Sequence, residues 1–276
     1  MSGRLEGRTV VMSGGSRGIG LAILVEAARH GANVAFLAKT DTPDPRLPGT
    51  VHTAVAEIEA VGGKAIGVVG DLRDPEAVDR LVSSAERHFG GIDICINNAS
   101  ALNLAATSEL SVSRFDLMQQ INYRGTFLLT RACLPLLAKS TAAHVLTLSP
   151  PLNMSPRWLG AHPSYTVSKY AMTLLTLGFA EEFRGSGIAA NCLWPQTTIA
   201  TAAVQNLLGG ESATAASRSP QIMADAAIEI LASAPADLTG RTLIDEEVLR
   251  EAGVTDFRRY GGGECPETDL FIDTVG

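Results

Sequence analysis

The sequence predicts an α/β fold: a doubly wound (Rossmann) parallel sheet of about seven strands, with helices on both faces. One observation is that short, nearly continuous apolar runs alternate with helix-length segments, as expected for strands buried on both sides. Another is that the first apolar run leads into a glycine-rich turn and then a helix, the order found in dinucleotide-binding folds. Strand and helix in alternation imply parallel pairing through right-handed crossovers.

Taken in order, the apolar runs predict strands at Thr9–Ser13, Asn33–Ala38, Ala65–Val69, Ile92–Ile96, Ala143–Leu148, Gly187–Leu193 and Arg241–Ile244. The segments between them predict helices at Ile19–His30, Pro75–Phe89, Ser113–Leu137, Tyr165–Phe183 and Ser219–Ala232. Residues 40–50, rich in Pro and polar side chains, indicate an extended loop. We expect residues 1–276 to form a single domain, with a C-terminal extension from about 246 to 276 that contains a short helical pattern.

Composition excludes several classes of function. A hydrophobic content of 46% is enough for a large core, and a net charge of -7 leaves no broad basic surface for nucleic acid. The four cysteines lie far apart without metal-ligand or redox-motif spacing, so we expect reduced thiols, no metal and a cytoplasmic location. No apolar run is long enough to span a bilayer, and the first residues do not form a signal peptide.

The glycine-rich turn follows the first strand and has glycines at Gly14, Gly18 and Gly20. Glycine permits positive φ and lets the backbone approach a pyrophosphate closely, and the N-terminus of the next helix offers free N–H groups to the phosphate. A glycine-rich run alone is weak evidence because loops collect glycine. Because this turn lies between the first strand and a helix, a cofactor site is a better interpretation than a tight structural turn.

Four motifs together resemble the short-chain dehydrogenase/reductase family. The glycine spacing is similar to its TGxxxGxG signature, with Ser13 in place of Thr, and residues 97–100 (Asn-Asn-Ala-Ser) resemble its NNAG motif. Asp71 and Leu72 resemble its adenine-contacting segment, and Tyr165 with Lys169 its YxxxK active-site motif. A narrower resemblance, to the dehydrogenase domain of one member that also carries a C-terminal sterol-carrier domain, lies in residues 38–40, 97–101, 149–153, 194–195 and 201–203.

The family resemblance implies a set of cofactor contacts. They are Gly14, Ser16, Arg17, Gly18, Ile19, Gly20, Lys39, Asp71, Leu72, Asn98, Ala99, Ser100, Tyr165, Lys169, Pro195, Ile199 and Thr201. NAD-selective sites place an acid at the end of the second strand, where it binds the ribose diol. This chain has Ala38 there, followed by Lys39, and Arg17 lies in the glycine turn. Two cations without a carboxylate favour the 2′-phosphate of NADP(H) over NAD(H), although Asp41 is close by.

Tyr165 and Lys169 are four residues apart on a predicted helix and therefore share one face. Reduction of a ketone needs a hydride and a proton, and a nearby ammonium lowers the pKa of a tyrosine from its usual value of about 10. A Tyr/Lys pair at this spacing is often only a surface pair. Beside the glycine turn, it indicates that Tyr165 is the general acid/base and that Lys169, as in the family, also holds the nicotinamide ribose.

Two further catalytic residues follow from the resemblance. Asn122 matches the helix asparagine that supports a proton-relay water in the family; otherwise it is a buried amide bonded to the backbone. The family polarises the substrate carbonyl with a serine after the fifth strand, typically the second of two. Here that second position is Pro150, which has no hydroxyl, so either Ser149 substitutes for it or another group or a water completes the oxyanion site.

The sequence therefore predicts an NADP(H)-dependent oxidoreductase acting on a carbonyl or secondary alcohol of an apolar or lipid-like small molecule. Trp158, Leu159, Trp194, Leu207 and Leu208 suggest an apolar substrate cleft, although packing explains such residues equally well. Two alternatives remain: a cofactor-binding sensor or assembly subunit with little turnover, and a fatty-acyl thioester reductase or hydroxyacyl dehydrogenase. The resemblance also implies a homodimer or homotetramer.

Overall fold

One parallel sheet forms the centre of the protein. The computed structural model describes residues 3–44, 48–207 and 210–273. The strands are β1 (Thr9–Ser13), β2 (Asn33–Ala38), β3 (Lys64–Val69), β4 (Ile94–Asn97), β5 (His144–Leu148), β6 (Ala189–Trp194) and β7 (Thr242–Ile244). Their order is β3-β2-β1-β4-β5-β6-β7, and every pair is parallel. The predicted doubly wound sheet in a single domain is thus confirmed, and its order reverses between β1 and β4, where such folds bind ligands.

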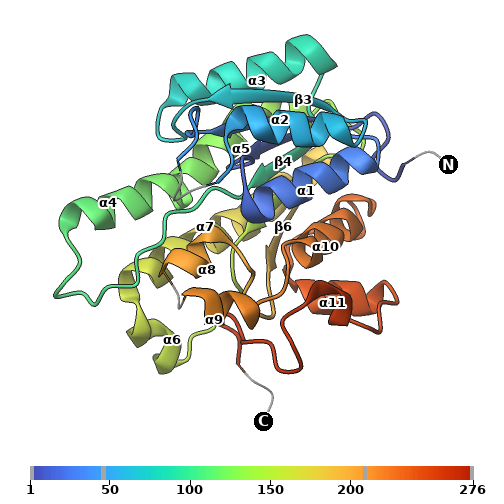
Figure 1. Ribbon diagram of the computed structural model, residues 1–276. Coiled ribbons are helices and arrows are strands. Elements are labelled where there is room, and N and C mark those ends of the chain that lie inside the picture. The colour runs from blue at the N-terminus through green and yellow to red at the C-terminus, as the bar shows by residue number, and fades with distance from the viewer. Residues whose placement is uncertain (1–2, 45–47, 208–209, 274–276) are drawn as a thin grey trace.

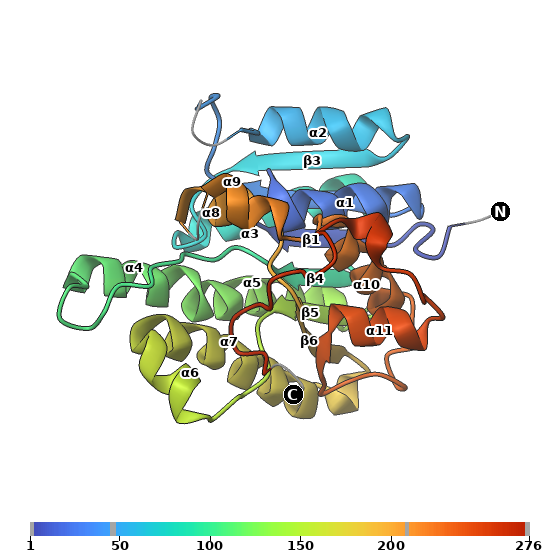
Figure 2. The ribbon, with the colours of Figure 1, turned by 60° about the horizontal axis from the view of Figure 1, so that its bottom comes forward.

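Helices cover both faces of the sheet (Figures 1 and 2). One face carries α1 (Gly18–Arg29), α2 (Val51–Ala60) and α10 (Gln221–Leu231), and α1 packs directly on α10. The other face carries α3 (Pro75–Phe89), α5 (Tyr123–Leu137) and α7 (Pro163–Glu182). Each layer buries its own apolar cluster against the strands, the first around Leu24 and Phe36 and the second around Leu81 and Leu129. The strand interiors are apolar on both sides for this reason.

The remaining helices are short or lie at the carboxyl end of the strands. They are α4 (Val112–Ile121), α6 (Pro156–Ala161), α8 (Ala202–Leu207), α9 (Gly210–Ala215) and α11 (Asp245–Glu251). No helix within the described ranges is both long and apolar enough to cross a membrane.

Helix α2 was not among the predicted helices, yet its start has a clear local cause. Thr50 and Thr53 form a reciprocal capping box, in which the Thr50 hydroxyl accepts from the Thr53 N–H and the Thr53 hydroxyl from the Thr50 N–H. The apolar face of α2 then buries Val51, Ala54 and Ile58 against the sheet. The predicted extended loop ends where this capping box begins.

The predicted helix Ser113–Leu137 is wrong as a single helix. The helix is interrupted at Asn122, where ψ is displaced to -80° with φ at -68°, and so divides into α4 and α5. The fully buried Asn122 side chain is bonded to Ala101 and Ser168, which fixes the break against neighbouring segments. Two predicted strands, Thr9–Ser13 and Asn33–Ala38, match the observed bounds, and the ends of the other five differ by at most two residues, which is normal for sequence-based boundaries.

The C-terminal segment returns to the carboxyl end of the sheet. After α11 it makes a short 3₁₀ turn (Arg258–Tyr260) and then runs toward α7, as Figure 2 shows. We call residues 267–273 the strap. The strap is held by backbone bonds to the segment that follows β6: Thr198 N–H donates to Glu267 O (2.8 Å) and Asp269 N–H to Gln196 O (3.1 Å).

Candidate active site

The glycine turn is shaped for a close ligand. Gly14 and Gly18 have φ values of +79° and +56°, in the left-handed region that glycine adopts without strain. A Cβ at Gly20 would lie 2.2 Å from the Gly14 carbonyl oxygen, so only glycine fits there. Among the described residues no side chain caps α1, and its first turn has no acid, so its N–H groups and dipole are available to a phosphate.

The loop after β4 is bonded to this turn. The Ser13 hydroxyl accepts hydrogen bonds from the N–H groups of Asn98 (3.3 Å) and Ala99 (3.2 Å). Ser13 can therefore make the same hydrogen bonds as the threonine that occupies this position in the family signature. The Asn98 amide donates to the carbonyls of Ser13 (3.2 Å) and Gly14 (2.8 Å). The two motifs, 84 residues apart in sequence, therefore form one rigid unit at the sheet reversal.

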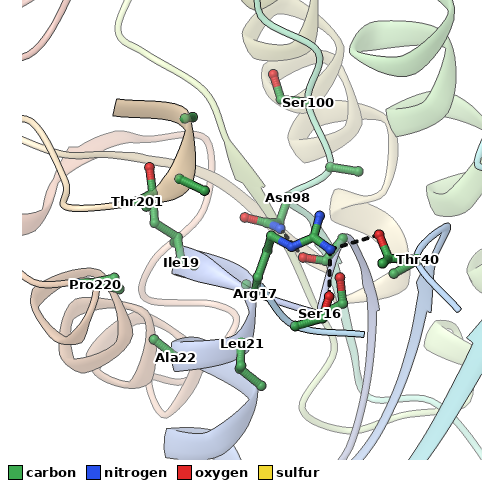
Figure 3. A pocket seen from close by; sticks show the side chains of 18 of the residues that line it. Ser16, Arg17, Ile19, Leu21, Ala22, Thr40, Asn98, Ser100, Thr201 and Pro220 are labelled. Carbon is green, nitrogen blue, oxygen red and sulfur yellow. Dashed lines mark hydrogen bonds between the residues drawn. The ribbon is translucent and has the colours of Figure 1, made fainter. Parts of the chain in front are cut away.

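A cavity of about 1780 Å³ opens over this unit (Figure 3). Most of the predicted cofactor contacts line it: Gly14, Ser16, Arg17, Gly18, Ile19, Gly20, Lys39, Asp71, Leu72, Asn98, Ala99, Ser100 and Thr201. Its volume exceeds the roughly 300–1,000 Å³ of pockets for drug-sized molecules, in keeping with a dinucleotide. The remaining predicted contacts, Tyr165, Lys169, Pro195 and Ile199, are not among the residues that line it.

The corner of the cavity next to β2 holds the predicted phosphate-reading cations. Arg17 donates to the Thr40 hydroxyl (2.8 Å) and to the carbonyls of Gly49 (2.6 Å) and Pro48 (3.1 Å), as Figure 3 shows in part. Burial lowers the pKa of Arg17, and the charge of Asp44 partly offsets this. Lys39 lies 3.1 Å from the Asp71 carboxylate rather than beside Arg17.

Two acids near this corner, Asp71 and Asp41, already bind neighbouring side chains. Asp71 also binds Arg73 (2.6 Å), and hydrogen bonds from Arg73 hold the pKa of Asp71 well below its usual range. Asp41, the acid that complicated the choice of cofactor, lies on the surface with its carboxylate 2.7 Å from His52 Nε2. It is not among the residues that line the cavity.

Helix α7 carries both Tyr165 and Lys169, and Lys169 reaches the end of β5. Both side chains are buried, and Lys169 Nζ donates to the Leu148 carbonyl (2.6 Å) and lies 4.9 Å from the centre of the Trp194 ring. Burial lowers the pKa of Lys169 to about 7, and burial followed by the charge of Asp269 raises the pKa of Tyr165. The expected lowering of the Tyr165 pKa is therefore wrong for this structure, because burial dominates and raises it. The tyrosine is protonated at neutral pH, as a proton donor must be before reduction.

Ser149 follows β5, and its hydroxyl is buried against α7. It accepts a hydrogen bond from the Thr173 hydroxyl (3.0 Å), and its exposed fraction is only 1%. Pro150 follows, and its carbonyl accepts from the same Thr173 hydroxyl (2.7 Å). Neither residue lines the cavity.

Asn122 anchors the loop after β4 to α7. Its amide group donates to Ala101 O (3.1 Å) and Ser168 Oγ (2.8 Å), and its side-chain oxygen accepts from Ala101 N–H (2.7 Å). Its backbone carbonyl accepts from both the N–H and the hydroxyl of Thr126. The residue thus makes the buried-amide contacts that were the alternative to a relay role, and the relay stays a prediction.

The segment after β6 is supported by a buried acid that sequence reasoning missed. Asp245 Oδ1 accepts from Gln196 N–H (2.8 Å) and Glu246 N–H (2.7 Å), while Oδ2 has no partner among the described residues. Burial raises the pKa of Asp245 to about 7. In the sequence, an acid at the start of α11 indicates only a favourable charge at a helix N-terminus. Nothing in the sequence indicated that Asp245 would be buried and would support the segment after β6.

Replacing Asp245 with asparagine should flatten the pH dependence of stability. Because the folded pKa lies above the unfolded one, Asp245 stabilises the fold below about pH 4, and this contribution is lost as the pH rises through about 7. We expect the free energy of unfolding of the wild type to fall by roughly 2 kcal/mol more between pH 5 and pH 8 than that of the variant. Urea titrations at the two pH values measure this difference.

Asp256→Asn is the matched control for that measurement. Its exposed carboxylate binds Arg258, and this hydrogen bond lowers the pKa of Asp256 to about 2, so it stays ionised throughout the window. Equal pH slopes for Asp245→Asn and wild type would show that Asp245 is not protonated on folding.

The strap lies directly on Tyr165, the predicted general acid/base, and was also missed. Phe271 packs on Tyr165, with ring centres 6.2 Å apart and planes 24° apart, and on the rings of Trp158, Tyr170 and Trp194. The run Leu270-Phe271-Ile272 was the available signal, because three apolar residues at the end of a polar segment indicate a buried anchor. Of the predicted cleft residues, Leu159 is partly exposed on α6, and the Leu207 side chain and Leu208 lie outside the described residues.

Comparisons with known proteins agree with this geometry. The short chain dehydrogenase family model matches residues 8–211. Hydroxysteroid dehydrogenase-like protein 2 of Danio rerio is 48% identical over 274 residues, covering 99% of this chain, and this chain spans 65% of that relative's length. A putative dehydrogenase from Xanthomonas campestris has a crystal structure with a TM-score of 0.94 and 47% identity, covering 98% of this chain and 99% of that one.

Two more distant solved structures are each 25% identical to this chain. A short chain dehydrogenase from Burkholderia cenocepacia, in complex with NADP, has a TM-score of 0.73 and covers 87% of this chain and 97% of that one. An NADH-dependent reductase complexed with NAD has a TM-score of 0.70, with coverages of 88% and 97%. With its glycine turn, its Tyr165–Lys169 pair and the family match over most of its length, this chain belongs to the short-chain dehydrogenase/reductase family of oxidoreductases.

Proposed function

We propose that the protein is an NADP(H)-dependent oxidoreductase that transfers hydride between the nicotinamide and a carbonyl or secondary alcohol of an apolar small molecule. The observation that carries the proposal is the cavity over the glycine turn, which lies at the same end of the sheet as Tyr165 and Lys169. Family membership supports a nicotinamide cofactor and a small-molecule substrate.

The residues present fit the cofactor. A Cβ at Gly14 or Gly20 would meet Asn98 or the turn itself within 3 Å, so these glycines let the turn pack closely on the loop after β4. The uncapped N-terminus of α1 then presents its N–H groups to a pyrophosphate. In the proposed assignment the glycine turn and the α1 N-terminus hold the pyrophosphate, and Asp71 and Leu72 contact the adenine. Ile199 and Thr201 hold the carboxamide end. When bound, the nicotinamide supplies or accepts the hydride.

The chain's own residues handle the proton. Tyr165 donates its phenolic proton to the oxygen of the substrate as the alkoxide develops, and takes it back in the oxidative direction. Lys169, when protonated, stabilises the phenolate that Tyr165 becomes. Because Ser149 is only 1% exposed and does not line the cavity, the geometry favours another group or a water as the donor that polarises the carbonyl.

The choice of NADP(H) rests on the corner between β2 and the glycine turn. Arg17, Thr40 and Lys39 line it, and no acid lies at the end of β2. Phosphate is recognised best by charge-assisted hydrogen bonds from such groups. The Lys39 side chain is exposed, so its ammonium group can leave the Asp71 carboxylate and bind a phosphate instead.

Lys39→Asp should shift the preference toward NADH. Loss of one charge-assisted bond to the 2′-phosphate and the new repulsion should lower the NADPH/NADH ratio of kcat/KM by about 10- to 100-fold. Lys64→Asp, a charge reversal at an exposed residue outside the cavity, is the control and should leave the ratio within about twofold. An unchanged ratio in Lys39→Asp would mean that Lys39 does not recognise the phosphate.

A cofactor-binding sensor with little turnover is the second candidate. Two observations favour it: Pro150 stands at the usual serine position, and Tyr165 is only 6% exposed beneath the strap. A panel of cyclic and acyclic ketones and secondary alcohols, followed by cofactor absorbance in wild type and Tyr165→Phe, separates the two. Turnover that depends on Tyr165 supports the enzyme, whereas cofactor binding with no turnover of any compound supports the sensor.

Two further proposals concern the setting of the protein. We propose a homodimer or homotetramer, supported by exposed apolar side chains on α5 (Phe127) and α7 (Val167 and Leu174). We also propose a reducing compartment such as the cytoplasm, supported by four free cysteines, three of them buried.

A further inference from the structure

The aromatic box around Phe271 has the composition of a ligand site. Its walls are Trp158 on α6, Tyr165 and Tyr170 on α7, and Trp194 at the end of β6, and the Phe271 ring lies 5.2 to 6.2 Å from the ring centre of each. Offset and tilted aromatic contacts at these separations are attractive for any flat apolar ring. The walls come from three different elements, whereas the ring at the centre comes from the strap.

Phe271 occupies the place that a substrate of Tyr165 needs. Its ring stacks on the Tyr165 ring, and Tyr165 is 6% exposed. The large cavity over the glycine turn does not reach Tyr165, Lys169 or Ser149. With the strap seated, the reacting side chains are therefore separated from the cavity in which a substrate would arrive.

The strap is attached by bonds that can be exchanged for water. Trp194 Nε1 donates to Leu270 O (2.9 Å), Trp158 Nε1 to Asp273 Oδ1 (2.9 Å), and the Asn153 amide to Phe271 O (3.1 Å) and Asp273 Oδ2 (2.8 Å). Asp273 itself is exposed. Phe271 has φ +71°, the one positive value at a non-glycine position among the described residues, so the seated strap carries backbone strain that release removes.

We propose that the strap is an internal plug, with Phe271 filling the aromatic box that binds a flat, apolar, uncharged ring of the substrate. Ring and strap compete for the box, so the substrate binds only after the strap has moved. The proposal deepens the proposed function, because it takes Tyr165 as the proton donor. Lys169 Nζ lies 4.9 Å from the Trp194 ring at the edge of the box, where it can donate a hydrogen bond to a carbonyl oxygen carried by the ring.

The test begins with a binding measurement that needs no turnover. The chain's two tryptophans, Trp158 and Trp194, both lie in the box, so energy transfer to N-phenylnaphthylamine, an uncharged aromatic dye, reports binding there. If the open form is populated at about 10% or less, the wild type binds the dye with at least about tenfold reduced affinity. Phe271→Ala should bind the dye about ten times more tightly than the wild type. The same variant should also make both tryptophans more accessible to acrylamide quenching.

A second variant keeps the box intact. Asp273→Ala removes two of the bonds that hold the strap while leaving every aromatic ring in place, so it should raise the dye affinity in the same direction by a smaller factor. Asp256→Ala, an exposed carboxylate outside the strap, is the matched control and should bind the dye like the wild type. Circular dichroism and NADPH binding establish that each variant is folded.

The outcomes separate this proposal from the proposed function. Unchanged dye affinity in folded Phe271→Ala and Asp273→Ala would overturn the plug. A rise in dye affinity without reduction of any ketone would support the plug, and would count only against the assignment of the protein as an oxidoreductase.

A kinetic test follows from the same proposal. With NADPH and tetralone, a flat bicyclic ketone, Phe271→Ala should lower KM about tenfold relative to wild type. An equal lowering for acetone would show that the box does not select rings.

Discussion

Tyr165→Phe is expected to lower kcat for NADPH-dependent ketone reduction by about 10³-fold or more, within the upper range for loss of a general acid. The phenolic oxygen is the proton donor in the proposed mechanism, and phenylalanine keeps the ring that packs against Phe271. Because the cavity that holds most of the cofactor contacts does not include Tyr165, the Kd for NADPH should change by less than about threefold. Cofactor absorbance and fluorescence titration measure the two quantities.

Tyr123→Phe is the control for the loss of a phenol. Tyr123 is the first residue of α5 and does not line the cofactor cavity, so kcat should stay within about twofold of wild type. Full activity of Tyr165→Phe would remove Tyr165 from the mechanism. Equal losses in both variants would instead indicate a general effect of removing a tyrosine hydroxyl.

Gly20→Ala is expected to weaken NADPH binding by about 100-fold. Its Cβ would lie 2.2 Å from the Gly14 carbonyl oxygen and 2.5 Å from the Asn98 amide nitrogen, so the turn and the loop after β4 must separate. A shift of about 1 Å in a positioned contact can cost a factor of this size. Forcing an extra methyl group into this packed unit should also destabilise the fold by about 1–3 kcal/mol and lower Tm by roughly 3–10 °C.

Gly185→Ala is the matched glycine substitution. A Cβ at Gly185 meets no atom within 4 Å, and its φ is not in the left-handed region, so both the Kd for NADPH and Tm should remain those of the wild type. Calorimetric titration of the two variants measures the Kd for NADPH, and thermal unfolding measures Tm. NADPH binding by Gly20→Ala as tight as the wild type would show that the turn does not hold the pyrophosphate.

The sheet could be predicted because its strands are apolar on both faces. Runs such as Val10-Val11-Met12 are buried completely, so an unbroken apolar run in the sequence predicts a buried strand directly. The break at Asn122 could not be predicted, because α4 and α5 together show a continuous helical pattern and the cause is a long-range bond to Ala101 and Ser168. Helix α2 is weakly amphipathic and follows a proline-rich segment, which concealed its start at Thr50.

The residues of the site divide in the same way. The glycine turn and the Tyr165–Lys169 pair are local motifs, and their spacing alone predicts which side chains meet. The pairing of Lys39 with Asp71 and the engagement of Ser149 by Thr173 depend on which side of a strand end each residue faces. Asp245 and Phe271 reach the site from the last part of the sequence, with no motif to mark them.

The order in which the site is completed also follows from the bonding of Ser13 to Asn98 and of Gln196 to Asp269. The bonds within the phosphate cradle join residues from the first hundred of the chain, whereas the aromatic box stays open until the strap, residues 267–273, has docked. During this interval Trp158, Tyr170 and Trp194 form an apolar surface without a cover. A chain whose strap has not yet docked would therefore expose an adhesive apolar surface, which a chaperone or a bound ring compound could shield until Phe271 covers it.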